Sequence, residues 1–239
     1  MVINPLDIRA LAFDVFGTVV DWRGSIIREG ELLSASKGLK VDWPAFADAW
    51  RAGYKPAIDS TRGEGAAWVD IDSLHRRILD GLLARFGLQA LSADGLAHLN
   101  RVWHRLMPWP DTVSGLNRLR ARFPISTLSN GNVSLLVDMA RNAGLPWDCV
   151  LSGELIHKYK PDPEVYLMAA RLLGVAPAQL MLVAAHPSDL AGAQRAGLRT
   201  AYVKRPLEYG AGVLGEPVGD LVFDFTATDF FDLAQQLGA

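Results

Sequence analysis

Short apolar runs, bounded by turn residues, recur along this chain. Runs of this length without polar alternation are typical of strands that are buried on both faces, as in a parallel sheet. Helix-like segments separate most of the later runs, which favours strand–helix–strand units around such a sheet. The runs span residues 10–16, 125–128, 149–151, 180–184, 200–203 and 221–223.

Two helices are well marked between these runs. Between Pro163 and Gly174, apolar residues recur at the three- and four-residue spacing of one helix face. A proline near the start and a glycine just past the end are usual helix boundaries. A second helix-like segment runs from Asp189 to Ala196 and stops at Gly197.

The segment from residue 21 to residue 109 has a different pattern. It is rich in Arg, Ala, Leu, Trp and His, its apolar residues recur at helical spacing, and it contains no convincing strand. This segment separates the first apolar run from all the others. The pattern therefore predicts an α/β fold with a parallel-sheet core, formed by residues 1–20 and 110–239, and an all-helical insertion over residues 21–109.

Composition and charge narrow the class of protein. The chain has 239 residues, half of them hydrophobic, and a net charge of -2, which gives no reason to expect binding to nucleic acid or to a membrane. The single cysteine, Cys149, excludes an internal disulfide and is expected as a buried core thiol in a reducing cytoplasm. The N-terminus lacks the order of a secretory signal, and no stretch approaches the length of a membrane span. We expect a soluble, cytoplasmic protein.

Reactive side chains occur in four loops that follow an apolar run or precede a helix. In a parallel sheet, ligands bind at the carboxyl ends of the strands, so these loops are the candidate functional site. The loops are Asp14-Val15-Phe16-Gly17-Thr18, Ser129-Asn130-Gly131-Asn132, Lys158-Tyr159-Lys160-Pro161-Asp162-Pro163 and Ala184-Ala185-His186-Pro187-Ser188-Asp189.

With these four loops in this order and at about this spacing, the chain resembles the haloacid dehalogenase superfamily over nearly its whole length. The forms D-x-F-G-T and L-S-N-G of the first two motifs resemble the 2-haloacid dehalogenase branch (type II, L-2-haloacid). The resemblance implies a Rossmann-like catalytic core with a helical cap subdomain at residues 21–109. It implies a hydrolase of the (S)-2-haloacid dehalogenase type, which converts haloacetates and L-2-haloacids to 2-hydroxy acids.

The residue two positions after Asp14 separates this branch from the phosphatases and phosphomutases of the superfamily. Those enzymes carry a second aspartate there, which protonates the leaving alkoxide, whereas this chain carries Phe16. A halide is a stable anion and needs no proton. His186 replaces the first acid of the phosphatases' fourth motif, and a hard cation prefers more carboxylate oxygens than Asp14 and Asp189 provide. We therefore expect no metal and no cofactor.

The resemblance also implies roles for individual residues. Asp14 would attack the halogen-bearing carbon and form a covalent ester, with inversion at that carbon. Asp189 would activate the water that hydrolyses the ester, and Lys160 would keep Asp14 ionised. The other positions surround the small-molecule haloacid: Thr18 and Ser129 for its carboxylate or for orienting Asp14, Arg51 and Asn130 for the halide, and Tyr166 and His186 as further substrate-binding groups.

The fourth motif departs from the S-S-N-A-W-D form of well-known members, because Ala184, His186 and Ser188 replace its serine, asparagine and tryptophan. The halogen, chain length and stereoselectivity therefore stay open. A phosphatase or phosphomutase and a non-catalytic binding protein on this fold remain as alternatives. Asp14 read alone could be a turn residue and Asp189 a helix cap. A homodimer is common in the resembled family and is carried as an expectation.

Overall fold

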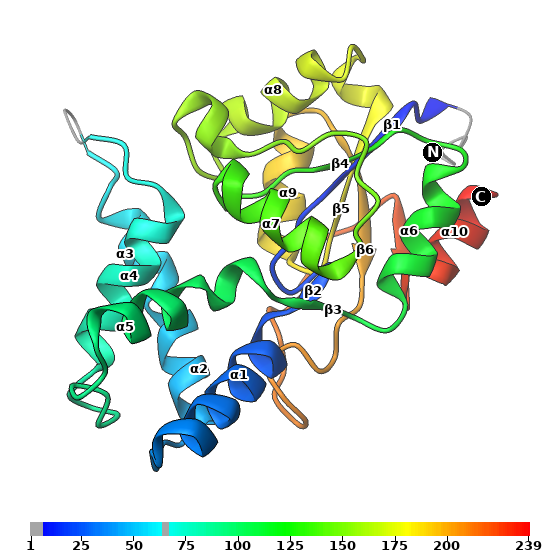
Figure 1. Ribbon diagram of the computed structural model, residues 1–239. Helices are drawn as coiled ribbons and strands as arrows, with labels where there is room; N and C mark the ends of the chain where they lie inside the picture. The colour runs from blue at the N-terminus through cyan, green and yellow to red at the C-terminus, as the bar shows by residue number, and fades with distance from the viewer. Residues whose placement is uncertain (1–6, 64–66) are drawn as a thin grey trace.

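The computed structural model of the chain describes residues 7–63 and 67–239 (Figure 1). Residues 1–6 of the predicted core, including the N-terminal segment examined for a secretory signal, and residues 64–66 of the predicted cap lie outside the described residues. The strands are β1 (Ala10–Phe13), β2 (Val20–Asp21), β3 (Met107–Pro108), β4 (Ile125–Thr127), β5 (Leu180–Ala184), β6 (Arg199–Val203) and β7 (Phe225–Ala227). The α-helices are α1 (Trp22–Lys37), α2 (Trp43–Ala52), α3 (Tyr54–Asp59), α4 (Ile71–Leu82), α5 (Ala93–Asn100), α6 (Thr112–Arg120), α7 (Val133–Ala143), α8 (Pro163–Leu172), α9 (Pro187–Arg195) and α10 (Phe230–Leu237), and the short 3-10 helices are η2 (Arg101–His104), η3 (Gly153–Ile156) and η4 (Pro177–Gln179).

A parallel sheet in the order β4-β1-β5-β6-β7 forms the centre of the molecule. Every residue of β1 and β5 is buried, which is why these strands have no polar alternation. The α/β fold expected from the sequence is thus confirmed. Because β1 pairs with β4 on one side and β5 on the other, the strand order reverses beside β1, which is where such sheets bind ligands.

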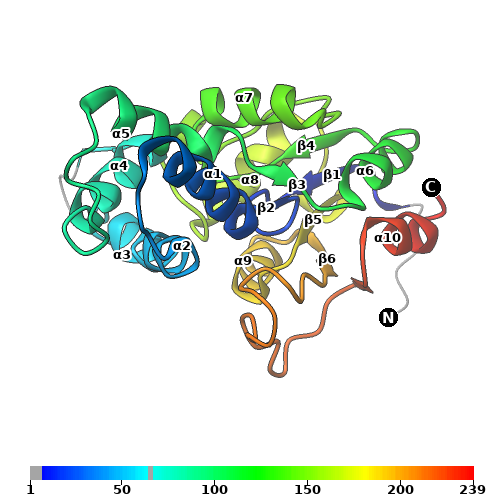
Figure 2. The same cartoon turned by 60° about the horizontal axis from the view of Figure 1, so that its bottom comes forward.

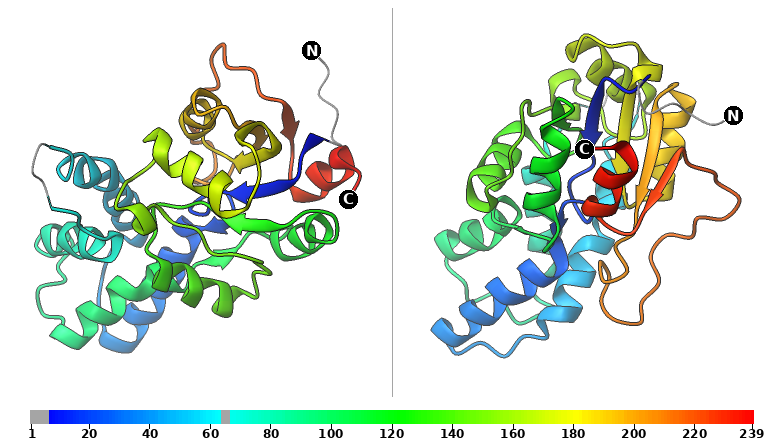
Figure 3. Two further views of the ribbon diagram at one scale, coloured as in Figure 1. Left: turned by 90° about the horizontal axis from the view of Figure 1, so that it is seen from above. Right: turned by 90° about the vertical axis from the view of Figure 1, so that its right-hand side faces the viewer.

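Helices cover both faces of this sheet (Figures 2 and 3). Along β1, Ala10 and Ala12 belong to a core shared with α8 and α9, whereas Leu11 and Phe13 belong to the core that includes α6, α7 and α10. This division follows from the two-residue period of a strand, which points successive side chains to opposite faces. Phe230 of α10 packs edge-on against Phe13 at 5.5 Å between ring centroids.

Two of the predicted strands are wrong. Residues 149–151 form no strand, because Cys149 and the following Ser152 each make only an isolated bridge. Cys149, expected to be buried, is half-buried. Residues 221–223 are also not a strand, and the side chain of Val222 is 80% exposed. The last strand is β7, which begins at Phe225. Residues 149–151 do lie beside β4, but the Leu151 amide donates to the Thr127 hydroxyl and not to a backbone carbonyl, which interrupts the ladder.

The segment after β1 is mainly helical, as expected, and lies at one end of the sheet (Figure 1). The expectation that this segment contains no strand is wrong, because β2 and β3 form a short antiparallel pair at its base. Asp21 begins α1, its carboxylate accepting a hydrogen bond from the Gly24 amide. The division of the chain at residues 20/21 and 109/110 stays a prediction. Among the described residues, no helix combines the length and apolar character needed to cross a bilayer.

Candidate active site

Strand register brings three of the predicted loops together. Phe13 of β1 lies level with Thr127 of β4 and Val183 of β5, so the chains that leave these parallel strands emerge at the same edge. Asp14 follows β1 directly, and its amide donates to the Val183 carbonyl. The loop containing Lys160 reaches this edge through its backbone amide, which donates to Asn130 Oδ1 at 2.8 Å.

Both oxygens of the Asp14 carboxylate are engaged. Oδ1 accepts from Lys160 Nζ at 2.8 Å, and Oδ2 accepts from the Thr18 hydroxyl at 2.7 Å and lies 3.0 Å from His186 Nδ1. Burial by itself would raise the pKa of Asp14, but the charges of Lys160 and His186 and their hydrogen bonds outweigh it and hold the pKa far below its ordinary value. Asp14 is therefore an anion at any physiological pH.

Lys160 joins this carboxylate to Asp189. Its ammonium lies 2.8 Å from Asp14 Oδ1 and 2.6 Å from Asp189 Oδ2, and the two acids raise its pKa above the ordinary value even though burial opposes them. The other oxygen of Asp189 accepts from the Tyr166 hydroxyl at 2.7 Å. Burial and the nearby Asp14 charge raise the pKa of Asp189, while Lys160 and Tyr166 limit that rise. A carboxylate with a raised pKa is suited to act as a general base.

His186 lies between two acids. Its Nδ1 faces Asp14, and its Nε2 lies 2.9 and 3.1 Å from the two oxygens of Glu208, a carboxylate only 3% exposed. Trp22 Nε1 donates to the same Glu208 at 3.1 Å. Burial would lower the pKa of His186, but Glu208 and Asp14 raise it to about 10. His186 consequently carries a positive charge at neutral pH.

Gly17 allows Glu208 to lie this close to the loop that carries Asp14. The residue has φ +81°, a conformation that favours glycine, and a Cβ at this position would collide with the Glu208 carboxylate. The Gly-Thr turn of the first motif therefore serves two purposes: it turns the chain after β1 and leaves space for a buried acid from the segment after β6.

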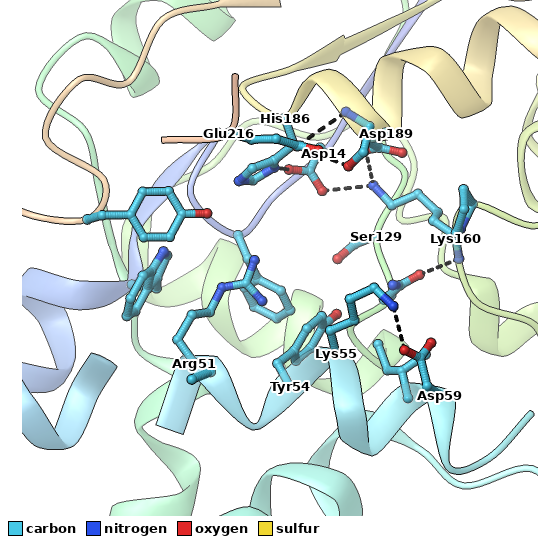
Figure 4. A pocket seen from close by; sticks show the side chains of 18 of the residues that line it. Asp14, Arg51, Tyr54, Lys55, Asp59, Ser129, Lys160, His186, Asp189 and Glu216 are labelled. Carbon is cyan, nitrogen blue, oxygen red and sulfur yellow. Dashed lines mark hydrogen bonds and ion pairs between the residues drawn. The ribbon is translucent and has the colours of Figure 1, made fainter. Parts of the chain in front are cut away.

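A cavity of about 990 Å³ opens between the sheet edge and the helical layer. Figure 4 shows the Lys160 ammonium next to Asp14 and Asp189, with Arg51 and Tyr54 across the cavity on the helical side. The Arg51 guanidinium lies 4.6 Å from the centre of the Tyr54 ring, and its buried Nε has no hydrogen-bond partner among the described residues. A cation held in this way is available to an anionic ligand.

Phe16 forms part of an apolar wall of the cavity. Its ring packs edge-on against Trp103 at 5.6 Å and Tyr54 at 6.5 Å between centroids. The side chain is 5% exposed, so it contributes no group that could donate a proton to a leaving group. A carboxylic acid at this position would instead face the aromatic cluster of the helical layer.

Seven of the nine predicted site residues line the cavity, namely Asp14, Arg51, Ser129, Asn130, Lys160, His186 and Asp189. The other two, Thr18 and Tyr166, lie behind the carboxylates and contact Asp14 and Asp189 respectively. Ser129 Oγ accepts from the Gly131 amide at 3.1 Å. The sequence reasoning missed Glu208, although its place shortly after β6 was a usable signal, because β6 ends at the same edge of the sheet.

The acids and the histidine of this region are not arranged as a metal site. Across residues 7–63 and 67–239, no group of three or more His, Cys, Asp or Glu side chains is placed to hold a metal ion. His186, between Asp14 and Glu208, would oppose a cation through its own charge.

Comparisons with known proteins agree on one family. A model of haloacid dehalogenase-like hydrolases matches residues 8–197. The (S)-2-haloacid dehalogenase 1 of Pseudomonas sp. (strain CBS-3) is 30% identical over 208 residues, which is 84% of this chain and 88% of that protein. A phosphoglycolate phosphatase of Thiobacillus denitrificans is 27% identical over 228 residues, covering 92% of this chain and 91% of that protein.

Two solved structures are similar over nearly the whole chain. The L-2-haloacid dehalogenase PA0810 is 46% identical with a TM-score of 0.92, and the match covers 97% of this chain and 99% of that one. The defluorinating L-2-haloacid dehalogenase Rha0230 is 45% identical with a TM-score of 0.93, and the match covers 97% and 96%.

Proposed function

The chain belongs to the haloacid dehalogenase-like hydrolase family, and on that premise we propose that it is a hydrolytic dehalogenase of short 2-haloalkanoic acids. The observation that carries the proposal is the Asp14–Lys160–Asp189 chain of contacts, which joins an ionised nucleophile to a second carboxylate of raised pKa. The likeness to L-2-haloacid dehalogenases at 45–46% identity supports the same substrate class.

In the first step Asp14 attacks the halogen-bearing carbon from the side opposite the halogen. A carbon–oxygen bond forms, the carbon–halogen bond breaks with its electron pair leaving on the halide, and the configuration at carbon inverts. Arg51, on the helical side of the cavity, and the Asn130 amide, at the sheet edge, stabilise the departing halide. Ser129, which lines the same cavity, binds the substrate carboxylate.

In the second step Asp189 removes a proton from a water molecule, which attacks the Asp14 carbonyl carbon. The bond between Asp14 and the substrate oxygen breaks, and that oxygen leaves as the hydroxyl of a 2-hydroxy acid after taking the proton. The carbon inverted in the first step is untouched in the second. Lys160, which contacts both carboxylates, stabilises each state of this exchange.

A phosphatase is the second candidate, favoured by the similarity to a phosphoglycolate phosphatase. Phe16 and His186 argue against it. Phe16 supplies no acid for an alkoxide, and the charged His186 disfavours the metal ion that would balance a phosphate. We therefore propose a metal- and cofactor-independent reaction.

Residues 21–109 are proposed as the cap, and a cytoplasmic homodimer is the proposed form of the protein.

The test compares halide release with phosphate release. EDTA-treated protein is incubated with chloroacetate, L-2-chloropropionate and fluoroacetate, and separately with p-nitrophenyl phosphate plus magnesium. Halide release that persists in EDTA and disappears in Asp14→Asn is the expected result. Magnesium-dependent phosphate release without halide would contradict the proposal. Fluoroacetate is included because one similar structure is a defluorinating enzyme.

The ester intermediate has its own test. In a single turnover in heavy-oxygen water, the label should enter Asp14 and the first product molecule should be unlabelled. Label found directly in the hydroxy acid would exclude attack by Asp14. Asp148→Asn serves as a matched control, because Asp148 pairs with Arg120 and the Ile125 amide at the start of β4, at the opposite end of the sheet.

A further inference from the structure

The contacts of Asp14 distinguish its two oxygens. Each carboxylate oxygen has two lone pairs that can accept hydrogen bonds. Oδ2 uses both, for the Thr18 hydroxyl and for His186 Nδ1, whereas Oδ1 accepts only from Lys160 among the described residues. Oδ1 therefore keeps a lone pair for displacement of the halide, and Oδ2 remains as the carbonyl oxygen of the ester.

The Thr18 hydroxyl has a fixed direction. Its oxygen accepts from the Ala185 amide at 2.9 Å, so its hydrogen is directed at Asp14 Oδ2 at 2.7 Å. His186 is fixed in the same way from its other side. Both ring nitrogens face carboxylate oxygens, which only accept hydrogen bonds, so both nitrogens carry a proton. The ring is then an imidazolium.

We propose that Thr18 and His186 form an oxyanion site for hydrolysis of the Asp14 ester, and that Glu208 is a positioning residue that keeps His186 in its charged form. When water adds to the ester carbonyl carbon, the electron pair of the carbonyl bond moves onto Oδ2. The two fixed donors, one of them charged, stabilise that negative charge, and collapse of the intermediate returns it to the carbonyl. This inference rests on the proposed function.

Glu208 suits this role because its own surroundings are fixed. It is almost fully buried, it accepts from Trp22 Nε1, and Gly17 leaves it the space beside the nucleophile loop. A buried carboxylate of this kind requires a charged partner, and His186 is the cation in contact with it. Glu208 does not line the cavity, so it acts on the reaction through His186.

The inference predicts an alkaline limb in the rate of ester hydrolysis. The rate falls as pH rises through the pKa of His186, which Glu208 holds above its ordinary value once Asp14 is esterified and has lost its charge. In Glu208→Gln the imidazolium loses this acid, so the limb moves to lower pH by roughly one to two units. The charged and titratable groups facing this unit are Asp14 and Glu208 on His186, Lys160 and Asp189 on Asp14, and Arg51, Tyr209, Tyr202 and Asp21 on Glu208.

The decisive experiment is a single turnover in which halide release and ester hydrolysis are timed separately. Glu208→Gln should keep the halide burst and slow hydrolysis roughly ten- to a hundredfold, so that the ester on Asp14 accumulates. Glu208→Asp keeps the charge, so its rate of ester hydrolysis should lie between the rates of Glu208→Gln and the wild type. In a His186→Asn background, Glu208→Gln should have no further effect on the rate of ester hydrolysis, because Glu208 acts on the reaction only through His186.

Several outcomes would overturn the inference. These are an unshifted alkaline limb in Glu208→Gln, equal slowing of both steps, or full additivity in the double variant. Asp148→Asn is the control for loss of a structural carboxylate and should leave the limb in place. NMR of isotope-labelled histidine in the resting protein tests the charge without turnover: His186 protonated on only one nitrogen at pH 7 would overturn the role of Glu208. Wild-type protein that releases no halide would overturn the proposed function, whatever the NMR result.

Discussion

The Tyr166 hydroxyl is bonded to one oxygen of Asp189 while Lys160 holds the other. Neither oxygen of Asp189 is therefore free to rotate, and the carboxylate is aimed along one direction. Burial raises the pKa of this acid and the two donors counteract that rise. At the scale of the residue, the balance between burial and hydrogen bonding sets the pH at which Asp189 becomes a base.

Tyr166→Phe tests that balance. The change removes a hydrogen bond to the charged form of Asp189 and leaves the packing of the ring, so the pKa of Asp189 rises further. The acidic limb of the rate of ester hydrolysis should move to higher pH by about one to two units. A pH–rate profile measures it. An unchanged limb in a normally folded variant would show that the phenol only packs.

Arg51 allows a second prediction at this scale. Arg51→Lys keeps the charge but loses the planar guanidinium on the Tyr54 ring, and it should raise KM for a haloacid roughly tenfold. Arg51→Met removes the charge and should also lower the rate of halide release by about 10²–10³-fold. Steady-state kinetics and the halide burst separate the two effects. Equal kinetics for wild type and Arg51→Met would exclude a halide role.

The sequence placed best the residues that we propose to act directly in the reaction. Asp14, Lys160 and Asp189 lie in loops whose order and spacing are readable, and the structure brings their charged groups together. Glu208 and Trp22 were not predicted because both lie outside the four loops, and although the place of Glu208 after β6 was a signal, its contact with Trp22 was not marked by any motif. No local pattern contains the information that such a pair meets.

At the scale of elements, His104 connects three parts of the chain. From η2, its ring lies 3.0 Å from the Asp72 oxygens of α4 and 2.8 Å from Asp138 of α7. Asn132, before α7, donates to the same Asp72. Burial would lower the pKa of His104, but the hydrogen bonds to the two acids raise it. The contact between the helical layer and the sheet-flanking helix thus depends on one charged ring.

The stability of this contact has a definite dependence on pH. Because the folded pKa of His104 is raised, its contribution is fully present below the unfolded value of about 6.5 and is lost as pH rises through the folded value. His104→Gln should lower the free energy of unfolding by about 1–2 kcal/mol at pH 6, a figure that allows for the partial exposure of Asp138.

Denaturant unfolding at pH 6 and at pH 9 measures the effect. The difference between wild type and His104→Gln should shrink as pH rises, because the wild-type ring loses its proton as pH passes through its raised pKa. His98→Gln, which changes an exposed histidine of α5, is the control and should behave as wild type at both values. A constant difference would indicate that the charge of His104 is not involved.

Helices were predictable where the segment with a helical pattern is long, and strands were predictable where all their side chains are buried. The two marked helices and the strands at β1, β4, β5 and β6 lie where the pattern predicted them. The failures at residues 149–151 and 221–223 are short apolar segments near the rim of the sheet. Their structure depends on whether a neighbouring strand is in register, which the segment itself does not encode.

At the scale of the whole molecule, the helical layer also touches the Lys160 loop directly. Arg62, which follows α3, lies 2.6 Å from Asp162 and donates to the Lys160 carbonyl. The Trp68 ring lies 4.4 Å from that of Tyr159, whose hydroxyl donates to the Val69 carbonyl. The proposed cap therefore contacts the loop that carries Lys160 through an ion pair, hydrogen bonds and ring packing.

Arg62→Ala should weaken the contacts between the proposed cap and the Lys160 loop. We expect faster amide hydrogen exchange in α3 and in residues 158–162, with only a small loss of global stability, because partly exposed ion pairs contribute at most about 1 kcal/mol. Exchange measured by mass spectrometry tests this. Arg76→Ala removes a surface pair within α4 alone and is the matched control. Unchanged exchange in the Lys160 loop would contradict the role of Arg62.

The space that Gly17 leaves for Glu208 has an evolutionary consequence. A glutamate at 208 without a cation at 186 would be a buried, unpaired charge, and a side chain at 17 would occupy its place. Related chains should therefore gain or lose the histidine and the acid together, and only in lineages that keep the glycine. Covariation of these three positions would divide the dehalogenases into two lineages, one with a charged group beside the nucleophile and one with the neutral asparagine.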